Sequence, residues 1–200
     1  MVRDIRRQEK RDALLRAAVD LFARNGYDAT AVSAIAERAG VSHGTVFLYF
    51  PSKEALFADA VLEPLKEFVD RSYEILDGPG SPVARIRRLV RTQMNEAATD
   101  RAYMLLVGSA MAQAERFGDL AQQVTHLVDR FVVRLAEVVT EGIASAELAG
   151  GSPLAIAASY ISYLSGVGLV VLHADAETWD QLVNQGLRLF ALSEGLHHDD

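Results

Sequence analysis

Residues 26–57 constrain the fold of this chain more than any other segment, because they hold two short helical patterns separated by a glycine turn. In the first pattern apolar residues recur at helical spacing, and Thr30 stands where the N-cap of a helix is expected. Gly40 can adopt the positive φ of a sharp turn, and Ser42 is placed to cap the second helix. Because so short a second helix needs its neighbours for support, the segment predicts a compact helix-turn-helix, an arrangement typical of DNA binding.

A glycine lies in the interior of this second helix, where it costs about 1 kcal/mol relative to alanine. Gly44 has two interpretations. A helix that closely approaches a phosphate or a base edge requires a small residue, and so does a helix packed tightly against another helix. Both interpretations remain open at the level of the glycine itself.

The same stretch resembles the tetracycline-repressor (TetR) family at many fixed offsets. By motif the resemblance covers residues 10–57, and the remainder is similar only in length and helical character. The resemblance implies a DNA-binding head followed by a ligand-sensing domain. The residues that carry it are Gly26, Tyr27, Thr30, Ile35, Ala36, Ala39, Gly40, Val41, Ser42, Gly44, Thr45, Tyr49, Phe50, Lys53, Glu54, Ala55 and Leu56.

The resemblance also implies which residues contact DNA, and it divides them into two groups. Phosphate contacts are expected from Thr30, Ser33, Tyr49 and Lys53, and the groove is expected to be faced by His43, Gly44, Thr45, Phe47 and Leu48. The capping residue Ser42 is also expected to bind DNA. Phe47 stands where the family often has tyrosine, and Leu48 stands where a polar residue is common. Apolar contact, for which a thymine methyl is the natural partner, therefore replaces hydrogen-bond readout at these positions.

Charge is distributed unevenly along the chain. Residues 1–53 hold nine Lys and Arg against six Asp and Glu, whereas the remaining 147 residues hold 11 against 21. An acidic body repels phosphate, so the N-terminal segment is expected to be the docking surface. The cations at the very start fit either a solvated arm or a DNA-contacting arm. They are Arg3, Arg6, Arg7, Lys10 and Arg11.

Helical periodicity continues through the rest of the chain, which predicts an all-α protein. We expect a three-helix DNA-binding domain at residues 1–53, joined to a larger helical ligand-sensing and dimerisation domain at residues 54–200. Pro64 is expected to kink or break the fourth helix. The absence of cysteine excludes disulfides and fits the cytoplasm, and no secretory signal pattern opens the chain.

Residues 154–174 form an uncharged run whose length would suffice for a membrane span. No Lys or Arg lies between Arg134 and Arg188, so a positive-inside anchor is missing, and we predict instead a helix buried on nearly all sides. Ser152 is its expected N-cap and Pro153 its first residue. The family resemblance implies that this helix and the next one pair across a homodimer. The expected interface residues are Ala158, Ser162, Gly166, Trp179, Leu182, Val183, Leu187 and Phe190.

Polar and polarizable residues are scattered among the apolar faces of the second domain. Each one alone is accounted for as an ordinary core or interface residue, but together they suit a ligand pocket. They are Gln93, Met94, Tyr103, Met104, Met111, His126, Tyr160 and Tyr163. The family resemblance implies a small-molecule effector, and the scarcity of cations on these faces favours a neutral or cationic, largely apolar one.

The sequence contains none of three common enzyme motifs, which are G-x-S-x-G, a Gly-rich phosphate loop and H-E-x-x-H. We therefore predict no catalytic residue, cofactor or metal. His173, Asp175 and Glu177 fit a solvated turn better than a metal site, and residues 197–200 fit a frayed tail. The combined prediction is a homodimeric repressor that binds a pseudo-palindromic operator and is released by a small molecule. The alternative is a helical small-molecule or lipid-binding protein without a DNA role.

Overall fold

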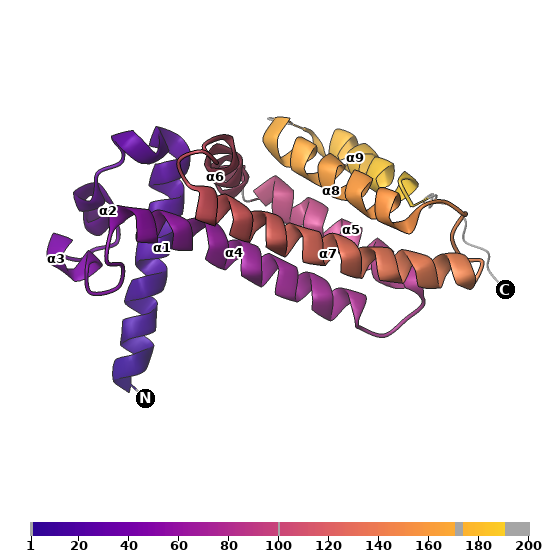
Figure 1. Ribbon diagram of the computed structural model, residues 1–200, viewed down its shortest axis with the longest axis horizontal. Helices are drawn as coiled ribbons and strands as arrows, with labels where there is room; N and C mark the ends of the chain where they lie inside the picture. Colours follow the sequence, from indigo (N-terminus) through magenta and orange to yellow (C-terminus); the bar gives the residue numbers. More distant parts are fainter. Residues whose placement is uncertain (1, 100, 171–173, 191–200) are drawn as a thin grey trace. The chain divides into compact units, whose positions relative to one another are not determined.

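The computed structural model describes residues 2–99, 101–170 and 174–190, and its regular structure there is helical throughout (Figure 1). The predicted all-α class is confirmed. The helices are α1 (Val2–Ala29), α2 (Val32–Arg38), α3 (His43–Val46), α4 (Lys53–Leu76), α5 (Pro82–Thr99), α6 (Arg101–Ala112), α7 (Gly118–Ala144), α8 (Pro153–Val170) and α9 (Ala176–Arg188).

The chain divides into two compact units. Unit 1 consists of Met1–Lys66 and Ala102–Val124, and unit 2 consists of Glu67–Arg101 and Thr125–Asp200. Helices α4 and α7 each begin in unit 1 and continue into unit 2. The sequence places the functional boundary between DNA binding and ligand sensing at residue 53, and that boundary remains a prediction.

Helix α1 is interrupted at Gly26, whose φ of +77° and ψ of 170° are not helical. The sequence pattern predicts a first helix from about Glu9 to Arg24, with Asn25 and Gly26 as its stop. The stop at Gly26 is confirmed, whereas the helix begins at Val2, before the predicted start. Because a residue with a Cβ is strained at this φ, the glycine lets the chain turn from α1 toward α2. Leu14, Ala18 and Phe22 are buried on the inner face of α1, as their spacing predicts.

Four aromatic rings form the centre of unit 1. The ring centroids of Phe22 and Phe57 are 5.1 Å apart, and Tyr27 lies 5.1 Å from Phe57. Phe117 joins them at 4.9 Å from Phe57 and 5.0 Å from Tyr27. Since Phe117 comes from the turn between α6 and α7, a segment distant in sequence completes the core beside the helix-turn-helix.

Helix α4 runs from Lys53 to Leu76 as one helix that contains Pro64. The sequence predicts a kink or a break at this proline, and the break does not occur. Leu62, Leu65 and Val69 are buried around it, and this packing holds the helical turns on either side of the missing N–H in place.

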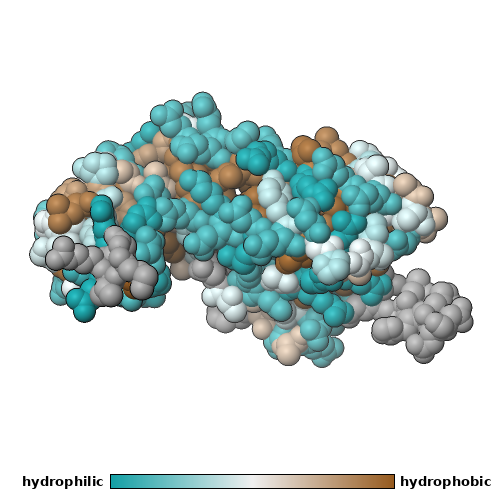
Figure 2. Space-filling model, turned by 90° about the horizontal axis from the view of Figure 1, so that it is seen from below, coloured by the Kyte–Doolittle hydropathy of each residue, from teal (hydrophilic) through white to brown (hydrophobic). Residues whose placement is uncertain are grey.

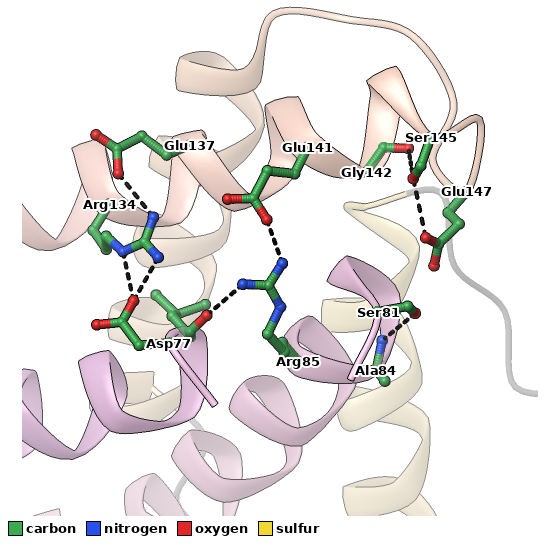
Figure 3. A network of polar contacts seen from close by, with 11 residues as sticks. Asp77, Ser81, Ala84, Arg85, Arg134, Glu137, Glu141, Gly142, Ser145 and Glu147 are labelled. Carbon is green, nitrogen blue, oxygen red and sulfur yellow. Dashed lines mark hydrogen bonds and ion pairs between the residues drawn. The ribbon is translucent and has the colours of Figure 1, made fainter. Parts of the chain in front are cut away.

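Two arginines connect the C-terminal end of α4 and the residue after it to α5 and α7 in unit 2 (Figure 3). Arg85 donates to the carbonyl of Leu76 at 2.7 Å and to the carboxylate of Glu141. Arg134 donates to Asp77 at 2.9 Å through its Nε. Because the carbonyls of the last helical turn have no partner within the helix, the bond to Leu76 satisfies the C-terminal end of α4.

Helix α8 begins at Pro153, and Ser152 Oγ accepts a hydrogen bond from the backbone N–H of Ala155 at 3.4 Å, as predicted. The expectation that this helix is buried on nearly all sides is wrong for the single chain. Tyr160 and Leu164 face the core, but the opposite face is uncharged and exposed, with Leu154 at 55%. Among the described residues, no helix is both long and apolar enough to cross a membrane.

Candidate nucleic-acid interface and ligand core

The reading helix α3 has only four residues in helical conformation, and local hydrogen bonds define its start. Ser42 Oγ accepts from the backbone N–H of Thr45 at 3.2 Å, and the two hydroxyl oxygens are 2.7 Å apart. The predicted cap is therefore confirmed. Val46 and Phe50 anchor the segment, since both are buried against the rest of unit 1.

The outer face of this segment is apolar. Phe47 is 44% exposed and Leu48 is 76% exposed, and Figure 2 shows hydrophobic surface at the end of the molecule that carries α3. Ser42 and His43 are also exposed, whereas Thr45 and Tyr49 are half-buried. Two large apolar side chains exposed next to each other, at the C-terminal end of a short helix, form a surface suited to contact with a partner.

The structure separates the two interpretations of Gly44. A Cβ built at this position meets no other atom within 4 Å, so tight helix packing does not require the glycine. Gly44 is exposed on α3, and the apolar pair Phe47 and Leu48 follows directly after the end of this helix. Of the two interpretations, the one that agrees with this structure is close approach of Gly44 to a partner outside the protomer.

Thr30 does not cap α2, and the predicted capping role is wrong. The N-cap is Ala31, and it makes no side-chain capping bond. The Thr30 hydroxyl instead donates toward the carbonyls of Gly26 at 2.7 Å and Leu21 at 3.1 Å, and the residue is only 2% exposed. Thr30 therefore fixes the turn after α1, while Ser33 is the exposed hydroxyl on α2.

Lys53 occupies a defined position at the start of α4. Its ammonium lies 4.5 Å from the centre of the Tyr27 ring and donates to the backbone carbonyl of Asp28 at 3.3 Å. The side chain is half-buried. A cation held in this way has lost part of its rotational freedom before it meets a phosphate.

Of the N-terminal cations, Arg11 is bound within the protein. It donates to Asp59 at 2.9 Å and to Glu63, and its guanidinium lies 5.2 Å from the centre of the Phe50 ring. The carboxylates hold its pKa above its usual value, mainly through the hydrogen bond to Glu63. Arg11 thus joins α1 to α4, and the DNA-contacting interpretation does not suit it.

The eight predicted ligand residues are divided between the two units. Unit 1 holds Tyr103, Met104 and Met111, and unit 2 holds Gln93, Met94, His126, Tyr160 and Tyr163. Several have ordinary structural roles. The Tyr103 hydroxyl donates to the carbonyl of Val61 at 2.8 Å, the Tyr163 hydroxyl donates to that of Leu182 at 2.7 Å, and Met111 and His126 are exposed.

Two of the predicted residues meet in a buried polar network that links three helices of unit 2. The Tyr160 hydroxyl of α8 donates to Gln93 Oε1 of α5 at 2.8 Å, and Gln93 Nε2 donates to Ser72 Oγ of α4 at 2.9 Å. All three residues are buried, and burial raises the pKa of the Tyr160 hydroxyl. Ser72 was missed in the sequence, although it interrupts the apolar stripe of α4 between the buried residues Val69 and Leu76.

Gln93→Leu is expected to lower the free energy of unfolding by about 2 to 3 kcal/mol, because the Tyr160 hydroxyl and Ser72 lose a buried partner. Tyr160→Phe, which removes only one donor, is expected to lower it by about 1 kcal/mol. Urea denaturation at one fixed protein concentration measures both. Strictly additive losses in the double variant would mean that the two residues are not coupled.

The predicted interface residues also divide according to their surroundings. Ala158, Ser162 and Gly166 are exposed along one face of α8. On α9, Trp179 and Leu182 are half-buried, whereas Val183 and Leu187, together with Phe190 just after the helix, are buried within the chain itself. The last three pack in the core of unit 2, so an interface between two copies would rest on the exposed face of α8.

Within the described part of the chain, no three His, Cys, Asp or Glu residues lie close enough together to hold a metal ion. Asp175 serves instead as the N-cap of α9, accepting from the backbone N–H of Thr178 at 2.7 Å. His173 and residues 197–200 lie outside the described residues.

Comparison with known proteins finds a family model that matches the helix-turn-helix. Residues 14–60, which include every predicted DNA-contacting residue, match the family model described as "Bacterial regulatory proteins, tetR family". The chain is 27% identical over 148 residues to the Fatty acid metabolism regulator protein of Bacillus subtilis, covering 74% of this chain and 75% of that protein. It is 32% identical over 123 residues to the HTH-type transcriptional repressor KstR of Rhodococcus jostii, covering only 56% of either protein.

A solved structure extends the similarity to nearly the whole chain. The transcriptional regulator FadR from Bacillus subtilis, in complex with stearoyl-CoA, matches with a TM-score of 0.70 and 25% sequence identity. The match covers 92% of this chain and 98% of that chain. The likeness therefore includes the helices that follow the helix-turn-helix.

Proposed function

We propose, on the premise that this chain belongs to the tetR family of bacterial regulatory proteins and is a transcriptional regulator, that it represses genes by binding a pseudo-palindromic operator as a homodimer. Regulators of this family are not enzymes, in agreement with the lack of catalytic motifs in the sequence. The observation that carries the proposal is the exposed surface of α3 and of the turn that follows it, where Phe47 and Leu48 accompany Gly44, a glycine that packing within the chain does not require. Because the proposed target is chromosomal DNA, we propose a cytoplasmic location.

The size of the reading helix supports a two-fold mode of binding. A helix of four residues buries too little surface to supply specificity alone, so two copies must read two half-sites. Their centres are expected about 34 Å apart, or a multiple of that distance, to match successive major grooves. Because phosphate contacts release counterions, binding is expected to weaken steeply with salt.

Base contacts and phosphate contacts are expected to respond differently to substitution. Phe47→Ala should cost about 1 to 3 kcal/mol at specific base pairs, whereas Lys53→Ala should weaken binding to all sequences alike and lower the salt slope by about one unit. Titration of each variant with selected and random duplexes at several salt concentrations measures the difference. Equal losses on both duplexes for Phe47→Ala would contradict its role in reading bases.

We propose an acyl thioester of coenzyme A as the effector. Support comes from the similarity to the Fatty acid metabolism regulator protein of Bacillus subtilis and to the structure of FadR from the same organism, which is in complex with stearoyl-CoA. The core of unit 2 is apolar around α5, where Leu89, Val90 and Met94 are buried, as contact with an acyl chain requires. This effector is apolar in its acyl chain, as the sequence predicts, but it is anionic rather than neutral or cationic in its nucleotide part.

Selection from a random DNA pool tests the proposal. The protein is expected to enrich a palindrome, and stearoyl-CoA is expected to release it, whereas coenzyme A or stearate alone should not. Enrichment of no sequence would favour the alternative of a small-molecule or lipid-binding protein without a DNA role. Release by the acyl thioester but not by its separate parts would show that the effector site reads both portions of the molecule.

A further inference from the structure

An arginine outside the helix-turn-helix is bound to the segment that leads into it. Arg116 lies in the turn between α6 and α7, and its Nη1 and Nη2 donate to the two carboxylate oxygens of Asp28 at 2.8 and 2.9 Å. Its guanidinium also lies 4.7 Å from the centre of the Tyr27 ring. This bidentate geometry fixes the orientation of the guanidinium more firmly than a single hydrogen bond does.

Asp28 lies between this arginine and Lys53. Lys53 contacts the same Tyr27 ring and donates to the backbone carbonyl of Asp28, while the Asp28 side chain remains 75% exposed. The hydrogen bond from Arg116, together with the charges of Arg116 and Lys53, holds the pKa of the Asp28 carboxyl below its usual value. A permanent negative charge therefore lies close to the lysine that is expected to contact phosphate.

The neighbouring residue holds this arginine in place. Phe117 packs against Tyr27 at 5.0 Å and Phe57 at 4.9 Å between ring centroids, inside the aromatic centre of unit 1. The backbone N–H groups of Arg116 and Phe117 both donate to the carbonyl of Gln113, which closes the turn. The position of Arg116 is thus set by packing as well as by its partner.

We propose that Arg116 is a positioning residue of the DNA interface, which neutralises Asp28 so that Lys53 can hold a phosphate. The proposal rests on the proposed function, in which Lys53 contacts the DNA backbone. Without Arg116, the Asp28 carboxylate would repel the phosphate and compete with it for the lysine ammonium. Asp28 is tolerated at this surface because an arginine from a distant part of the chain balances its charge.

The two single variants are expected to change DNA affinity in opposite directions, which distinguishes this role from that of a purely structural ion pair. Arg116→Ala in the full-length protein is expected to weaken binding to a random-sequence DNA duplex about fivefold for each DNA-binding domain that contacts the duplex. This factor corresponds to the interaction of one unit charge with another at contact distance in water. Asp28→Asn is expected to strengthen binding by a similar factor, and the double variant should return to near the wild-type affinity. An ion pair that only stabilises the fold predicts that both single variants weaken binding or that neither changes it.

Fluorescence anisotropy with a labelled random duplex measures these affinities, and circular dichroism verifies that each variant is folded. Arg130→Ala and Asp129→Asn, a pair of exposed residues on α7, make the same changes in net charge elsewhere and should leave the affinity unchanged. Losses in both Arg116→Ala and Asp28→Asn, or no rescue in the double variant, would overturn the proposal. Failure of the wild-type protein to bind any duplex would instead overturn the proposed function on which it rests.

Discussion

Gly166→Glu is expected to convert the protein into a monomer and to abolish operator binding, although the reading head is untouched. A Cβ at Gly166 meets no atom within 4 Å in the single chain, so the protomer itself has room for the new side chain. In the proposed dimer the same carboxylate would be buried without a partner, which costs several kcal/mol. Light scattering gives the oligomeric state, and duplex titration gives the operator affinity.

The matched control is Gly150→Glu, which adds the same charge at another exposed glycine of unit 2 whose Cβ also meets nothing within 4 Å. It is expected to remain dimeric and to bind the operator normally. A dimeric Gly166→Glu protein with wild-type operator affinity would show that the exposed face of α8 is not the interface. Wild-type protein that is already monomeric would contradict the two-fold model itself.

Gly44→Glu is expected to weaken operator binding about a hundredfold in each half-site, or about 3 kcal/mol, because it places a bulky anion where the backbone approaches DNA. The open space around Gly44 in the protein means that the variant should fold normally. Thermal unfolding and duplex titration on the same sample separate folding from binding. Gly150→Glu again controls for the added charge.

Gly44→Ala sharpens this test, since alanine is favoured over glycine in a helix by about 1 kcal/mol. The variant should unfold at a higher temperature and yet bind its operator more weakly. Stronger or unchanged operator binding in Gly44→Ala would show that α3 does not approach DNA closely at this position.

Features that depend on a few consecutive residues could be predicted from the sequence. The cap at Ser42, the cap at Ser152 and the stop at Gly26 are all present as predicted, because each involves backbone groups within a few positions. The capping role predicted for Thr30 is wrong, because neighbouring residues alone allow two arrangements of its side chain. Its hydroxyl could cap α2 or donate to carbonyls of α1, and only the packing of the turn selects the second arrangement.

The sequence by itself determined the all-helical class, the helix-turn-helix and the exposed apolar pair Phe47 and Leu48, because helical periodicity and turn residues are local properties. The tertiary structure alone decided which distant residues meet. It joined Ser72 to Gln93, paired Arg116 with Asp28, and buried Leu187 and Phe190 inside the chain instead of leaving them for a partner. Periodicity reveals that a helix has an apolar face, but the identity of the surface that covers this face is set by how whole helices pack.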